Sequence, residues 1–169
     1  LKKIEITGGT RIPSCAFAYF NNVEEIILPE TITKIDEGAF HNCSSLLSIT
    51  IPENTKEIGA RAFSGCIGLT EITIPLNVEK IGAQVFYECS GLANIDFSDG
   101  LKEIGESAFG YCTSLTSVTL PISVKEIKSG AFGNCTSLTS LTISESTEII
   151  GSQILSGCCS LEKLVLPYA

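Results

Sequence analysis

The sequence predicts a predominantly β solenoid, a stack of about seven coils of 23 residues each. Three columns of residues repeat at this interval in one shared register. The isoleucine column consists of Ile12, Ile35, Ile58, Ile81, Ile104, Ile127 and Ile150. The other two consist of Phe17, Phe40, Phe63, Phe86, Phe109 and Phe132, and of Cys43, Cys66, Cys89, Cys112, Cys135 and Cys158. Self-similarity at a fixed period of this length is the mark of a repeat architecture, so the columns together indicate a solenoid.

The first apolar stretch of each coil is expected to form a strand. Segments such as LTEITIP from Leu69 and LTSVTLP from Leu115 alternate apolar and polar residues and are rich in β-branched side chains, a pattern typical of strands. Proline follows this stretch in most coils and should end the strand, because proline cannot donate a ladder hydrogen bond. These prolines are Pro29, Pro52, Pro75, Pro121 and Pro167.

A second, shorter apolar stretch of the form V-x-x-I-G follows in most coils. Its glycines are Gly59, Gly82, Gly105 and Gly151, and we expect a sharp bend there because glycine has a permissive backbone. Outward residues of this stretch mostly alternate in sign from coil to coil, as in Lys34, Glu57, Lys80 and Glu103. Opposite charges should therefore stack on neighbouring coils. Exposed pairs add little stability, so we interpret them as a guard against register slips.

One domain is expected to cover residues 1–169. Its coils start at residues 1, 23, 46, 69, 92, 115 and 138, and residues 161–169 form a last half-coil. The chain begins at a strand motif and stops just after one, without a polar cap, although stable arrays usually need caps. We therefore expect a segment of a longer protein, or a domain whose open ends associate end to end.

The elements L-x-x-I-x-I-P, V-x-x-I-G, A-F and C, as in LTEITIPLNVEKIGAQVFYEC from Leu69 to Cys89, resemble the BspA-type (Treponema-type) leucine-rich repeat family. The resemblance covers essentially the whole chain. It implies an α/β-class leucine-rich-repeat solenoid, a right-handed stack with a parallel β-sheet on one face and short strand, 3-10 and turn segments on the other. The departures affect only local turns: Ser98 and Ser144 in place of proline, Lys128 in place of glycine, and Phe20 in place of cysteine.

The eight cysteines could bind a metal, form disulfides or remain as free thiols. Zinc ligands come as short C-x-x-C pairs, which this chain lacks, whereas a coil spacing of ~4.8 Å would permit disulfides between neighbouring coils. We favour a column of reduced, buried thiols, because Phe20 fills the same slot in the first coil and free cysteine packs as a small hydrophobe. Cys15 and Cys159 lie outside the column, and Cys15 is expected to be exposed.

Composition narrows the classes of function. A net charge of −8 argues against nucleic acid and anionic membrane surfaces, because both need basic patches. Apolar runs are too short for membrane insertion. The lone His41 has no Ser or Cys in a fixed relation to it, so a catalytic triad is not supported. No enzymatic activity, cofactor or metal is expected.

The outward residues of the first strands form the candidate binding surface. β-Branched threonine also simply suits an exposed strand, so the hypothesis depends on the regularity and extent of the whole face. The residues in question are Ser48, Thr50, Glu71, Thr73, Asn94, Asp96, Ser117, Thr119, Ser140 and Thr142.

The family resemblance implies an extracellular or cell-surface protein that takes part in adhesion. We therefore expect a non-enzymatic module that binds a protein or glycan ligand, for example host extracellular matrix. The alternative is a structural spacer or assembly element within a longer surface protein.

Overall fold

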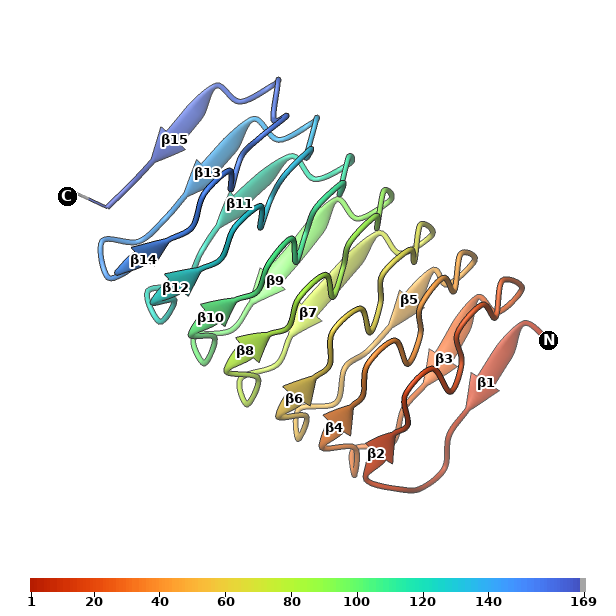
Figure 1. Cartoon of the computed structure of the whole chain (residues 1–169). Helices are drawn as coiled ribbons and strands as arrows, with labels where there is room; N and C mark the ends of the chain where they lie inside the picture. The colour runs from red at the N-terminus through yellow and green to blue at the C-terminus, as the bar shows by residue number, and fades with distance from the viewer. Residues whose placement is uncertain (168–169) are drawn as a thin grey trace.

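The computed structural model describes residues 1–167 and consists of stacked coils with strands on two of their sides (Figure 1). Residues 168–169, the end of the expected half-coil, lie outside the described residues. The first strands are β1 (Lys3–Glu5), β3 (Glu25–Ile27), β5 (Ser48–Ile49), β7 (Glu71–Ile74), β9 (Asn94–Phe97), β11 (Ser117–Thr119), β13 (Ser140–Thr142) and β15 (Lys163–Val165). The second strands are β2 (Arg11–Ile12), β4 (Lys34–Ile35), β6 (Glu57–Ile58), β8 (Lys80–Ile81), β10 (Glu103–Ile104), β12 (Glu126–Ile127) and β14 (Ile149–Ile150).

The predicted parallel pairing of the first strands is confirmed, and the second strands, expected only as short segments, also pair in parallel. On the second-strand face, all seven strands join one parallel sheet in the order β14-β12-β10-β8-β6-β4-β2. On the first-strand face, the strands form three separate parallel sheets, β1-β3-β5, β7-β9 and β11-β13-β15. The register follows the repeat, since Ile72 pairs with Ile95 and Ile104 with Ile127. The longer first strands therefore carry the interrupted sheet, and the two-residue second strands carry the continuous one.

The remaining side of each coil, between the second strand and the next first strand, consists of turns and is called the turn side below. Within residues 1–167 it contains no α- or 3-10 helix, so this chain is a β solenoid without the 3-10 segments that were expected. Two positions per coil have a positive φ. One column is Cys15, Gly38, Arg61, Gln84, Ser107, Gly130 and Gln153, and the other is Tyr19, Asn42, Gly65, Glu88, Tyr111, Asn134 and Gly157.

These left-handed positions let alternate amides of the turn side point to the next coil. In the coil that starts at residue 69, the amide of Tyr87, which lies between two of these donors, bonds within its own coil to the carbonyl of Gln84. The donors to the next coil are Gln84 to the Glu106 carbonyl at 2.9 Å, Phe86 to Ala108 at 2.8 Å and Glu88 to Gly110 at 2.8 Å. The turn side thus closes a ladder between coils, as buried backbone groups require.

The glycines after the second strands serve a different purpose from the predicted bend. Gly59 and Gly151 do not have a positive φ. Instead, the backbone of the preceding coil passes very close to them. A Cβ on Gly59 would lie 2.5 Å from the amide nitrogen of Glu37, and one on Gly151 would lie 2.5 Å from that of Ser129. Glycine is needed here because neighbouring coils approach too closely for a side chain.

A continuous stack of phenylalanine rings fills the centre of the solenoid. Rings of successive coils lie nearly parallel, with centroids 5.2 to 5.6 Å apart. The rings from Phe40 to Phe132 are fully buried, while Phe17 at the N-terminal end is partly exposed. Burial of a large aromatic side chain is a major source of stability. Because each ring is covered by the rings on either side, this core exists only when coils stack.

The cysteine column lies beside the phenylalanine stack and is bonded to it. The thiol of each column cysteine donates to the carbonyl oxygen of the phenylalanine 26 residues earlier, with Sγ···O distances of 3.0 to 3.2 Å. The predicted burial of this column is confirmed except at Cys158, which is half-buried, and Cys15 is exposed as expected. Burial raises the pKa of the Cys89 thiol to about 12, so this thiol stays protonated and able to donate.

Removal of a ring from the middle of the stack is expected to lower the free energy of unfolding more than removal of an aromatic ring at the end of the solenoid. Phe86→Ala should lower the free energy of unfolding by ~3–5 kcal/mol, because it leaves a cavity between two stacked rings. Phe20→Ala should cost much less, since Phe20 lies at the N-terminal end and is 41% exposed. Urea-induced unfolding of the two variants and the wild type measures the difference. Equal losses would contradict the role given to the stack.

The left-handed turn positions predict a stabilising substitution. Glu88 has a φ of 60° and is exposed, so Glu88→Gly should raise the free energy of unfolding by up to ~1 kcal/mol by removing the cost of a Cβ in this conformation. Glu106, an exposed glutamate without a positive φ, is the matched control. Glu106→Gly should be destabilising by roughly 0.5–1 kcal/mol. Thermal unfolding of both variants gives the signs, and the same sign in both would contradict the argument.

Candidate functional site

The structure places all the predicted binding residues on the outer side of the first-strand face. They are exposed except Ser140 and Thr142, which are half-buried. Some of them are brought together around one hollow of about 380 Å³, and these are Ser48, Thr50, Glu71, Thr73, Asn94 and Asp96. The others, Ser117, Thr119, Ser140 and Thr142, lie further along the face and do not line it.

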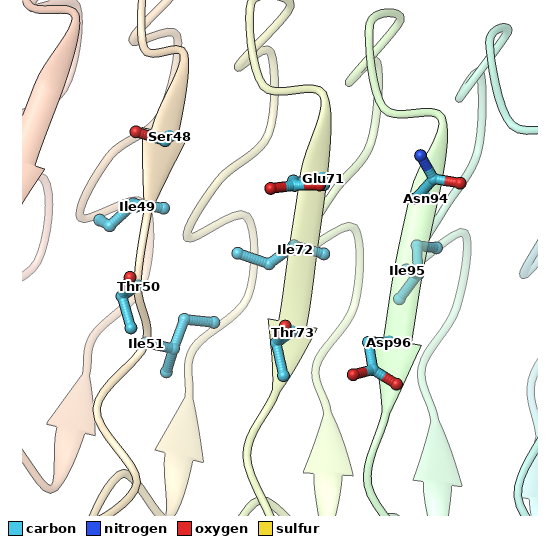
Figure 2. A pocket seen from close by; sticks show the side chains of 10 residues that line it. All are labelled: Ser48, Ile49, Thr50, Ile51, Glu71, Ile72, Thr73, Asn94, Ile95 and Asp96. Atoms are coloured by element: carbon cyan, nitrogen blue, oxygen red, sulfur yellow. The ribbon is translucent and has the colours of Figure 1, made fainter.

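The hollow lies where the first-strand face is interrupted between β5 and β7 (Figure 2). At the entry to most first strands, an amide bonds back to the preceding coil: Leu47 donates to the Glu24 carbonyl at 3.0 Å, and Ala93 donates to the Thr70 carbonyl at 2.9 Å. Among the described residues, the equivalent amides of Thr70 and Thr116 make no such bond to the coil before them. The first-strand face is interrupted at both places, between β5 and β7 and between β9 and β11, and the hollow lies at the first of them.

The floor of the hollow is apolar and its rim is acidic. Ile49, Ile51 and Ile72 are buried at its base, and Ile49 and Ile72 lie between the labelled polar side chains in Figure 2. The carboxylates of Glu71 and Asp96 on the rim have no ion-pair partner within residues 1–167. A smaller hollow of about 140 Å³ continues towards β3, and it also has glutamates in its lining.

The second-strand face differs because its charges are largely paired within the protein. The predicted stacking of opposite charges between coils is confirmed there. This face also has a hollow, of about 470 Å³, lined by lysines and carboxylates, but most of these take part in ion pairs. The pairs are Lys34–Glu57 at 2.5 Å, Lys80–Glu103 at 2.8 Å, Lys102–Glu79 at 2.7 Å, Lys125–Glu148 at 3.7 Å, and Arg11–Asp36.

Lys128, which replaces glycine in the repeat, has a clear role on this face. Glu103 pairs in register with Glu126, a like-charge neighbour that would be unfavourable by itself. The amino group of Lys128 lies 2.9 Å from the Glu103 carboxylate, and that of Lys80 lies 2.8 Å away. Partial burial opposes ionisation of Glu103, but the bonds to both lysines outweigh it and lower the pKa of its carboxyl group. The departure from the repeat therefore compensates a local clash of charge.

The sequence did not predict the position of the hollow. The isoleucines of its floor follow the same pattern as those of every other coil, so nothing in the repeat distinguishes β5 and β7 from β11 and β13. The acidic residues of the rim were visible as interruptions of a Ser/Thr face. Among residues 1–167, no three His, Cys, Asp or Glu side chains converge to hold a metal ion. The described chain also contains no helix long and apolar enough to cross a membrane.

The repeat geometry agrees with a family model. Residues 10–123 and 102–169 match the model of the BspA type leucine rich repeat region, in 6 copies. The chain belongs to the BspA-type leucine-rich repeat family. No curated protein matches it in sequence.

Solved structures share the fold of this BspA-type chain. A leucine-rich repeat protein from T. pallidum is 35% identical, with a TM-score of 0.81 over 84% of this chain and 69% of its own. One from Eubacterium ventriosum is 24% identical, with a TM-score of 0.85 over 99% of this chain and 44% of its own. A leucine-rich cell surface protein from Faecalibacterium prausnitzii is 24% identical, with a TM-score of 0.55 over 100% of this chain and 60% of its own. This chain thus spans less than two thirds of the latter two structures.

The Glu103 site predicts a pH dependence of stability. Its pKa is lowered below the ordinary value of 4.5, so its ion pairs contribute stability above that pH, and the contribution is lost as pH falls through the folded-state pKa. The difference in unfolding free energy between wild type and Glu103→Gln should therefore shrink on acidification. Denaturant unfolding at a series of pH values measures it. Glu145→Gln, at an exposed glutamate outside these ion pairs, should show no such trend; a constant difference for Glu103→Gln would contradict the assignment.

Proposed function

We propose that this BspA-type domain is a non-enzymatic recognition module of the cell surface or extracellular space. It binds a protein ligand across the first-strand face and mediates adhesion, for example to host extracellular matrix. The observation that carries the proposal is the hollow at β5, β7 and β9, where two carboxylates without an ion-pair partner within residues 1–167 flank an apolar floor.

The chemistry of the hollow favours a basic ligand segment. Lysine and arginine combine an aliphatic stem with a charged end group. The stem can pack on Ile49 and Ile72, while the charged end reaches the carboxylate of Glu71 or Asp96. Arginine suits such a carboxylate particularly well, because its planar guanidinium can form two parallel hydrogen bonds. The net charge of −8 adds a long-range attraction for a basic partner.

The family supports a surface location and an interaction role. One solved structure with this fold is described as a leucine-rich cell surface protein from Faecalibacterium prausnitzii. Because the chain spans only part of such proteins, other regions of a full-length protein can contribute to the adhesion. A glycan ligand on the same face is the second candidate, favoured by the hydroxyl groups of Ser48, Thr50 and Thr73 at the rim.

Charge reversal at the rim tests the proposal. We expect the immobilised wild-type domain to bind at least one member of a panel of soluble matrix proteins in a saturable way at physiological salt. Glu71→Lys/Asp96→Lys should weaken this binding at least tenfold, a loss of ~1.4 kcal/mol or more. Added salt should also weaken wild-type binding, because it screens exposed charges. Surface plasmon resonance measures both effects.

The matched control reverses the same number of charges elsewhere. Glu37 and Glu106 occupy equivalent, exposed positions after the second strand, in coils three repeats apart, and Glu37→Lys/Glu106→Lys should bind as the wild type does. Equal loss of binding in both double variants would mean that the ligand responds only to the net charge of the protein, and not to the carboxylates of the rim. Binding kept in Glu71→Lys/Asp96→Lys would move the site to another side of the solenoid. No binding by the folded domain would instead favour the spacer function.

A further inference from the structure

A second hollow lies on the turn side, away from the first-strand face. It has a volume of about 230 Å³ and crosses the coils that start at residues 69, 92, 115 and 138. Its floor consists of Gly110, Gly130 and Gly133, at positions where other coils carry side chains such as Ser64 and His41 or Arg61. The run of glycines removes side chains from neighbouring coils and so creates the depression.

Two tyrosines form an aromatic wall at one end of this hollow. The ring of Tyr87 lies directly against Gly110, since a Cβ on that glycine would be 3.0 Å from Cδ2 of the ring. Tyr111 of the next coil meets Tyr87 edge to face, with ring centroids 5.4 Å apart and an interplanar angle of 70°. Tyr111 is 43% exposed. The rings therefore hold each other in place at the surface and add little to the core.

The backbone of Tyr111 is left-handed, with a φ of 61°, in a region that is unfavourable for bulky residues. The equivalent positions in other coils include Asn42, Gly65 and Asn134, but also Tyr19 and Glu88. The conformation therefore belongs to the repeat. Asparagine tolerates it well, so it is a substitution for Tyr111 that the fold already accommodates.

The lining of the hollow is polar but carries no charge, although the protein as a whole is strongly acidic. Its hydrogen-bonding groups are amides and hydroxyls that can both donate and accept. Gln84 is oriented by a bond from Arg61 Nε to its Oε1 at 2.7 Å, which leaves its amide N–H groups available. Gln153, Asn134 and Ser107 supply further groups from three other coils.

We propose that this tyrosine hollow is a binding subsite for a neutral oligosaccharide. Sugar rings present a C–H face that packs on tyrosine, and hydroxyl groups that match uncharged amides and hydroxyls. The coils repeat at about the length of one pyranose unit, as the 5.3 Å spacing of the Phe109 and Phe132 rings shows. An extended chain lying along the solenoid axis thus meets Tyr111 and Tyr87 first and then the amides of Gln153 and Asn134. This site is separate from the hollow on the first-strand face.

Titration with defined neutral glycans tests the proposal. The probes are cellohexaose, xylohexaose, mannohexaose and maltohexaose, with the acidic hexamer of galacturonic acid as the charged comparison. Isothermal titration calorimetry measures binding, and intrinsic tyrosine fluorescence gives a second readout because the chain has no tryptophan. We expect at least one neutral hexasaccharide to bind and the acidic hexamer to bind far more weakly.

The repeat itself supplies variants that keep the fold. Tyr111→Asn introduces the residue found at Asn42 and Asn134, and Tyr87→Ser introduces the residue found at Ser64 and Ser156. Each should weaken glycan binding about tenfold, which corresponds to ~1.4 kcal/mol. Tyr19→Asn, at the same coil position but outside the hollow, should leave binding unchanged.

Three outcomes would overturn the proposal: no binding of any neutral hexasaccharide, equal binding of the acidic hexamer, or unchanged binding in Tyr111→Asn and Tyr87→Ser. The matrix-protein experiment on Glu71→Lys/Asp96→Lys reports on a different side of the solenoid. Its failure and the failure of the glycan site are therefore distinguishable.

Discussion

Each coil has to satisfy its backbone hydrogen bonds through its neighbours, and this constraint governs the rest of the molecule. A 23-residue coil has no interior of its own in which amides could be paired. The second strands, the turn side and most of the first-strand face all donate to an adjacent coil. Every other regularity follows, since a coil that bonds to its neighbours on several sides has to match them in length and in register.

The core adapts to the spacing that these ladders impose. Phenylalanine rings stacked nearly parallel fill the space between coils at 5.2 to 5.6 Å, and the column of thiols bonds to carbonyl oxygens of the same phenylalanines. Where neighbouring backbones approach closely, as at Gly59 and Gly151, there is no room even for a methyl group. The two left-handed residues of each turn are also a consequence, because they direct alternate amides to the next coil.

Two departures from this regularity coincide with the hollows that are proposed to bind ligands. At one of the two interruptions of the first-strand ladder, between β5 and β7, a hollow opens with the carboxylates of Glu71 and Asp96 on its rim. Where glycines interrupt the turn-side columns, an uncharged hollow forms beside Tyr87 and Tyr111. On the second-strand face the ladder is continuous and the charges are mostly paired, so that side has fewer free groups to offer. The three sides of the solenoid thus differ in surface chemistry: one has an acidic hollow, one has an uncharged hollow, and one has mostly paired charges.

The repeat in the sequence was sufficient to predict the fold, because columns such as Phe40 to Phe132 and Cys43 to Cys135 can be buried together only in a stack of equal coils. It also predicted which residues point outward and that opposite charges such as Lys80 and Glu103 meet. It did not predict the interruptions of the first-strand face, the left-handed turns or the reason for Gly59. Those features depend on small differences in how closely successive coils approach and bond to one another, and only the tertiary structure decided them.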